Sequence, residues 1–92
     1  MYLFSCTATA KKVLPGINIG DKKPFIVYIH FADLLGAEHL CKLYLMVEGF
    51  HQIQIEKRKQ LATEQVIGLQ EHDEDIREAL KTGFQIRMFE SH

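Results

Sequence analysis

The residues of this chain that could do chemistry are five histidines and two cysteines, since imidazole and thiolate groups bind metals and act as bases or nucleophiles. His39 and Cys41 stand two residues apart in a segment with helical periodicity, and side chains at that spacing point to different sides of a helix. The chain contains neither a C-x-x-C nor an H-x-x-x-H motif. We therefore predict no metal site, no cofactor and no catalytic residues, and we favour a function other than catalysis.

The two cysteines are predicted to be core thiols. Cys41 lies on the apolar stripe of a predicted helix, and Cys6 lies among the apolar residues of a predicted strand. A thiol–imidazole pair of Cys41 with His39 or His30 is the competing interpretation, which the position on the buried stripe disfavours. We expect both thiols to be reduced, because no signal for secretion precedes them.

The charged residues limit the partners. The formal net charge is −1 and the isoelectric point is near 6.5, so the excess of cations that drives general nucleic-acid binding is missing. A local basic run remains, and a weak nucleic-acid site there is one alternative function; its residues are Lys57, Arg58 and Lys59. A charged strand end that prevents edge pairing is the other interpretation of this run.

The first ten residues do not resemble a secretory signal, because their apolar stretch has no basic residues before it and the lysines follow it. No window reaches the roughly 18 to 20 apolar residues that cross a bilayer. We therefore expect a cytoplasmic protein without a membrane partner. The 47% of apolar and 25% of charged residues are typical of a folded globular chain.

Hydrophobic periodicity predicts the order β-β-α-β-α-β in one domain, residues 1–92. Strands are predicted over 2–9, 25–31, 51–56 with an extension toward 59, and 84–89; helices are predicted over 33–48 and 73–82. Asp33 and Asp73 are the predicted N-caps, and Gly49 and Gly83 the predicted stops. Residues 61–72 are left open between a short strand over 65–69 and a packed loop.

This order predicts an α+β two-layer sandwich, with a mainly antiparallel four-stranded sheet and both helices on one face. A right-handed crossover and a long hairpin place the first strand between the second and the third, and the last strand at an edge. The other sheet face would then be open to solvent.

The strand over 25–31 is apolar on both faces, which is typical of a strand covered on both sides. A chain of 92 residues has little material for two helical layers, so we expect a second copy or a partner protein to cover the open face. The predicted interface consists of Leu3, Ile26, Tyr28, His30 and Phe89.

A small-molecule site is the second alternative function. The segment 11–24 is rich in turn signals and joins the first two strands, so it could close a pocket against the sheet. Tyr28, His30 and His51 are the predicted side chains of that pocket. Our leading hypothesis nevertheless is a non-enzymatic domain that works by protein–protein contact, as a homodimer formed through the open face.

Overall fold

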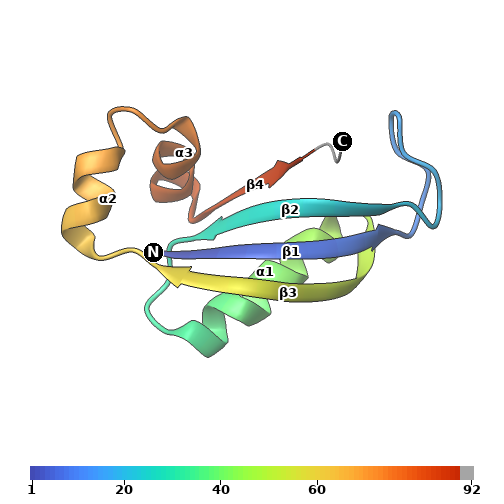
Figure 1. Ribbon diagram of the computed structural model, residues 1–92, viewed down its shortest axis with the longest axis horizontal. Helices are drawn as coiled ribbons and strands as arrows, with labels where there is room; N and C mark the ends of the chain where they lie inside the picture. The colour runs from blue at the N-terminus through green and yellow to red at the C-terminus, as the bar shows by residue number, and fades with distance from the viewer. Residues whose placement is uncertain (90–92) are drawn as a thin grey trace.

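Four strands form one antiparallel sheet in the computed structural model, which describes residues 1–89 (Figure 1). The strands are β1 (Tyr2–Ala10), β2 (Lys22–Ile29), β3 (Phe50–Gln60) and β4 (Phe84–Met88). Their order across the sheet is β3-β1-β2-β4, and each neighbouring pair is antiparallel. The predicted α+β class, the central first strand and the edge position of the last strand are confirmed.

Three helices accompany the sheet: α1 (Leu34–Val47), α2 (Thr63–Leu69) and α3 (Glu74–Thr82). The Asp33 carboxylate accepts a hydrogen bond from the Gly36 N–H at 2.8 Å, and the Asp73 carboxylate accepts one from the Asp75 N–H at 2.9 Å. Both residues are thus the N-caps that the sequence predicted. Gly83 ends α3 with φ of 96°, a left-handed conformation that glycine adopts without strain.

Helix α2 lies where we expected a strand or a loop, so that expectation is wrong. The side chain of Gln65 accepts a hydrogen bond from the Ala62 N–H at 2.8 Å, which satisfies one backbone donor at the start of the helix. Val66 is the buried residue of α2. Because only one of its seven residues is buried, α2 has no repeating apolar pattern from which a helix could be predicted.

The main core lies between α1 and one face of the sheet. Residues of β1 alternate between buried and half-buried, as predicted for a strand with one covered face. The largest completely buried side chains of this core come from β1, β2 and α1; they are Phe4, Cys6, Val27, Ile29, Cys41 and Leu45.

A second, smaller core lies on the opposite face of the sheet. It joins Tyr28 of β2 to Leu61, Val66, Ile76 and Ala79. The prediction that both helices share one face is therefore wrong: α1 lies on one side, and α2 and α3 gather on the other side at one end of the sheet (Figure 1). Strand β2 is fully covered on both faces only at its Tyr28 end, where α3 forms the second cover.

The segment 11–21 joins β1 to β2 at the end of the sheet far from α2 (Figure 1). Leu14 and Ile17 form an isolated antiparallel bridge in it, and the Ala10 N–H donates to the Asp21 carbonyl at 2.8 Å. Among the helices of residues 1–89, none is long and apolar enough to cross a membrane.

Candidate functional site

The sheet face opposite α1, here called the open face, is the candidate site. Directly paired residues of an antiparallel sheet point to the same side, so the strand register defines this face. Figure 1 views it from the front, with α1 behind the sheet. Its side chains come from all four strands and include Leu3, Ser5, Thr7, Ile26, Tyr28, Lys57, Lys59, Gln85 and Arg87.

A bulge in β3 places Lys57 and Lys59 on the open face. Ile55 pairs with Cys6 and Lys57 pairs with Ser5, so Glu56 is an extra residue in the ladder. An extra residue reverses the alternation of side chains along the strand. Ile55 therefore packs against the α1 core, while Lys57 lies on the other side of the sheet.

Alternation of residues along the sequence alone would place Lys57 and Lys59 on the α1 side of the sheet. Ile53, Ile55, Lys57 and Lys59 fall on one face when every second residue is counted. The bulge contradicts this expectation, because Lys59 pairs with Leu3, which belongs to the open face. Two cations that simple alternation assigns to the α1 side therefore lie on the open face.

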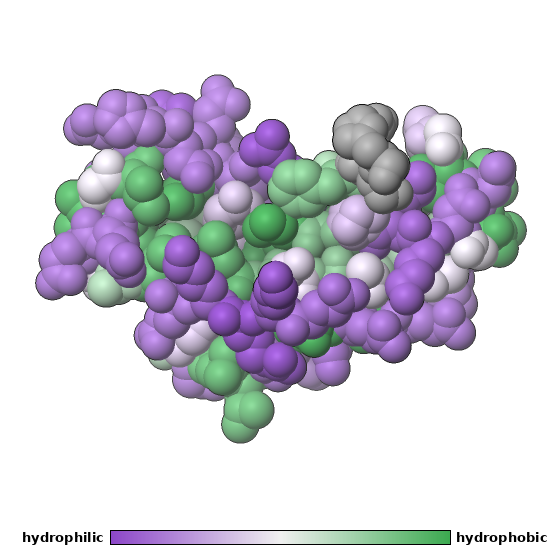
Figure 2. All heavy atoms as spheres, in the orientation of Figure 1, coloured by the Kyte–Doolittle hydropathy of each residue, from purple (hydrophilic) through white to green (hydrophobic). Residues whose placement is uncertain are grey.

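The two lysines border an apolar hollow of about 150 Å³, whose lining includes Leu3, Ser5 and Ile26. Figure 2 shows hydrophobic surface in the middle of this view, with hydrophilic surface above it near α3 and below it near β3. The ion pairs found within residues 1–89 are Arg58–Glu38 and Arg87–Asp75, and neither lysine takes part in them. The hollow therefore combines an apolar floor with two available positive charges.

The third residue of the basic run lies on the other side of the sheet. The Arg58 guanidinium pairs with Glu38 of α1. The predicted nucleic-acid site, Lys57, Arg58 and Lys59, is thereby divided between two faces, and only its two lysines lie together.

Tyr28 lies at the covered end of the open face. Its side chain is 7% exposed, because α3 packs on it. Burial raises the pKa of the Tyr28 phenol, and the carboxylates of Asp73 and Asp75 raise it further. The Asp75 carboxylate also binds a residue of β4: Arg87 donates from Nη1 to Asp75 Oδ2 at 2.9 Å.

Phe89 lies on the same face at the uncovered end. Its backbone N–H donates to the Pro24 carbonyl at 3.0 Å, which continues the pairing of β4 with β2. The Arg87 guanidinium lies 5.6 Å from the centre of the Phe89 ring. Phe89 is 39% exposed, so it extends the apolar surface toward the open end.

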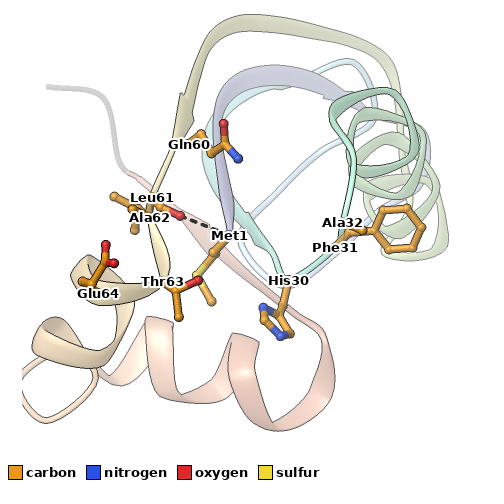
Figure 3. A pocket seen from close by; sticks show the side chains of 9 residues that line it. All are labelled: Met1, His30, Phe31, Ala32, Gln60, Leu61, Ala62, Thr63 and Glu64. Carbon is orange, nitrogen blue, oxygen red and sulfur yellow. Dashed lines mark hydrogen bonds between the residues drawn. The ribbon is translucent and has the colours of Figure 1, made fainter.

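His30 belongs to a different site, a cavity of about 790 Å³ at the end of the sheet next to α2. Figure 3 shows His30 on one side of this cavity, with Thr63 and Glu64 from the first turn of α2 on another. The Met1 amino group donates to the Leu61 carbonyl at 3.3 Å in its lining. His30 is thus not part of the open face with the other four predicted interface residues.

The predicted small-molecule pocket is not assembled. His51 pairs with Thr9 near the far end of β1, whereas His30 follows the end of β2 that pairs with Tyr2. The segment 11–21 lies at the His51 end, so it closes no pocket over Tyr28 and His30. Within residues 1–89, no three His, Cys, Asp or Glu side chains are grouped so that they could hold a metal ion.

Sequence reasoning found Leu3, Ile26, Tyr28 and Phe89 because period-two alternation is maintained in β1, β2 and β4. It missed the contribution of the two lysines and of α3 to the same face. No family model, curated protein or solved structure matches this chain.

Proposed function

We propose that this chain is a protein–protein contact domain that forms a homodimer through its open face. The observation that supports the proposal best is the apolar hollow bordered by Lys57 and Lys59, together with the acidic helix α3 on the same side of the sheet. Interfaces commonly combine an apolar centre with a polar, charged rim. The open face has this composition within a single copy.

The charges of the face are separated across the sheet. Residues 73–83, which cap, form and end α3, contain four acidic and two basic side chains, whereas the far end of β3 carries consecutive cations. Helix α3 packs on β4 and β2, and β3 lies at the opposite edge. The acidic and basic parts of the face thus occupy opposite edges of the same end of the sheet.

A twofold axis that runs between two facing sheets, parallel to the strands, exchanges these edges. It keeps the ends of the strands together and places α3 of each copy beside β3 of the other. Glu74 and Glu78 are exposed and one turn apart on α3, so they are the residues that we expect to meet Lys57 and Lys59. Stacked sheets lie about 10 Å apart, which leaves room for a helix to flank the partner's edge strand.

The apolar centre and the charged rim have different roles in this dimer. Burial of Leu3 and Ile26 against the partner supplies affinity, since a completely buried aliphatic side chain contributes about 1.5–3 kcal/mol. Exposed ion pairs contribute about 0.2–1 kcal/mol each, so the charges chiefly fix the orientation of the copies. We expect a dissociation constant on the order of 1 μM.

Charge reversal tests the proposal. Lys57→Glu with Lys59→Glu, and separately Glu74→Lys with Glu78→Lys, should each give a folded monomer by light scattering coupled to size exclusion. An equimolar mixture of the two variants should restore a dimer, because the reversed charges again match. Lys12→Glu with Lys42→Glu is the matched control, since both lysines are exposed, Lys42 lies on α1 and the Lys12 side chain lies against Gly49 at the end of α1; it should remain dimeric.

Two results would contradict the proposal. One is a wild-type chain that stays monomeric at every concentration measured. The other is a dimer that survives both charge reversals but is lost when Leu43 and Val47, exposed on α1, are changed to Glu. That second result would move the interface from the open face to the outer side of α1.

A further inference from the structure

The two cysteines meet in the centre of the main core. Cys6 lies in the middle of β1 and Cys41 in the middle of α1, and their Sγ atoms are 4.0 Å apart. Both are free thiols, with 1% and 0% of their surfaces exposed. They are separated by 35 positions in the chain, so their contact joins the central strand to the helix that covers it.

We propose that Cys6 and Cys41 form a covalent modification site, at which a peroxide-class oxidant produces an intramolecular disulfide that locks α1 onto β1 and that dithiols reverse. A disulfide requires an S–S distance of about 2.05 Å. The sulfurs must therefore approach by about 2 Å, which side-chain rotations within two packed elements can supply. The proposal concerns the core and does not depend on the homodimer.

The contact between the thiols allows one sulfur to stabilise the thiolate of the other. Either sulfur can donate this hydrogen bond. When Cys41 donates it, the bond lowers the pKa of the Cys6 thiol, whereas the same bond and burial raise the pKa of the Cys41 thiol. A thiolate is the species that attacks peroxide, and the proposal assigns this role to Cys6, with Cys41 as its hydrogen-bond donor.

The reaction has two steps. The Cys6 sulfur attacks one peroxide oxygen, so that an S–O bond forms, the O–O bond breaks and the leaving oxygen departs as water once protonated. The Cys41 sulfur then attacks the Cys6 sulfur; the S–S bond forms, the S–O bond breaks and a second water leaves with the Cys41 proton. The two thiols lose two electrons and two protons in total, which is two hydrogen atoms, and one hydrogen peroxide becomes two waters.

Access to the thiols depends on motion of α1. Both sulfurs are covered in the closed fold, so peroxide reaches them when α1 separates from the sheet. The rate of oxidation should consequently level off as peroxide is increased, at the rate at which α1 opens.

Cross-linking two distant positions restricts the unfolded chain and so stabilises the fold. For a link of this span in a chain of this size, we expect the thermal midpoint to rise by roughly 10–20 °C. Treatment of the linked chain with a dithiol should return its thermal midpoint to that of the reduced chain.

The experiment treats the folded chain with hydrogen peroxide and records its intact mass, its peptide map and its melting curve. The expected product has lost two hydrogen atoms, contains a peptide that joins Cys6 to Cys41, and melts at the higher temperature. Cys41→Ala lacks the second thiol, so its oxidation should stop at the Cys6 sulfenic acid, which a dimedone adduct reveals. Its oxidation should also be slower than that of the wild type, because the hydrogen bond that lowers the pKa of the Cys6 thiol is missing. Cys6→Ala should form no internal link and should keep the melting temperature of its untreated form.

Several results would overturn the inference. They are disulfides between copies in place of the internal link, sulfinic and sulfonic products without a link, or a folded chain that resists peroxide although its unfolded form reacts. A second measurement does not rely on the variants: the link is made in denaturant and the chain is refolded. A linked chain that fails to refold, or that melts below the reduced chain, would show that the geometry does not fit a disulfide.

Discussion

At the scale of single residues, Tyr28 shows how α3 changes the open face. Period-two alternation placed its side chain on that face correctly, but the exposed aromatic that the sequence predicts is 7% exposed in the structure. Ile76 and Ala79 of α3 cover it. A pattern along one strand identifies the face that a residue occupies, and it carries no information about which distant segment covers the face.

Burial of Tyr28 predicts a loss of stability at alkaline pH. An unfolded tyrosine titrates near pH 10, and the folded Tyr28 has a higher pKa, first through burial and then through Asp73 and Asp75. The stabilising contribution of the neutral phenol is therefore complete below about pH 10 and is lost as the pH rises through the folded pKa. Urea unfolding at about pH 8 and about pH 10.5 should show a larger loss of free energy for the wild type than for Tyr28→Phe.

The phenylalanine variant is a close control because it keeps the ring and removes only the titrating oxygen. Equal losses of unfolding free energy in the two proteins would contradict the assignment. The Arg87 guanidinium, which slightly opposes the raised pKa of Tyr28, is present in both.

At the scale of elements, the sequence predicts the ends of α1 and α3 well. Asp33, Asp73 and Gly83 are local signals, since each acts on backbone groups within a few residues of itself. The bulges of β3 have no comparable signal. Glu56 is an ordinary strand residue in the sequence, and Gln52 has a φ of 51°, a conformation that side chains other than glycine seldom adopt. The face on which Lys57 and Lys59 lie could therefore be assigned only from the observed pairing of β3 with β1.

Two glycines provide a matched test of helix interiors and helix ends. Gly68 lies within α2 and Gly83 ends α3 at φ of 96°, and an added Cβ would meet nothing within 4 Å at either position. Gly68→Ala should raise the free energy of unfolding by about 0.5–1 kcal/mol, because alanine favours the helix. Gly83→Ala should lower it by about 1 kcal/mol, because alanine is strained at positive φ.

Chemical denaturation of the two variants measures this difference directly. Opposite signs are the expected result, since the surroundings are open in both cases and only the backbone conformation differs. A destabilised Gly68→Ala variant would mean that α2 does not hold its helical conformation in solution.

At the scale of the whole molecule, the strand order was predictable and the side taken by α3 was not. The handedness of β2-α1-β3 and the hairpin between β1 and β2 leave few arrangements for three strands. No such rule applies to a helix that precedes an antiparallel edge strand, so this helix can pack on either face of the sheet. In this protein α3 packs on the face opposite α1, because Tyr28, Leu61 and Val66 provide an apolar surface there for Ile76.

The two faces consequently carry cores of unequal size. The α1 side contains most of the completely buried side chains, whereas α2 contributes Val66 as its buried residue and α3 contributes Ile76 and Ala79. Segments with few buried contacts open more readily than the central strands. We expect the amides of α2 and α3 to exchange with solvent deuterium faster than those of β1.

Hydrogen exchange at two protein concentrations then connects this uneven stability to assembly. In the proposed homodimer each α3 lies beside the partner's Lys57 and Lys59, so its opening competes with dimer formation and its exchange should slow as concentration rises. The amides of α1 lie on the opposite side of the sheet and should change least. Lys57→Glu with Lys59→Glu should remove the concentration dependence of α3 and keep its faster exchange. A wild type that dimerises by light scattering while α3 exchanges at the same rate at both concentrations would place the contact away from the open face, because a partner seated there restrains α3.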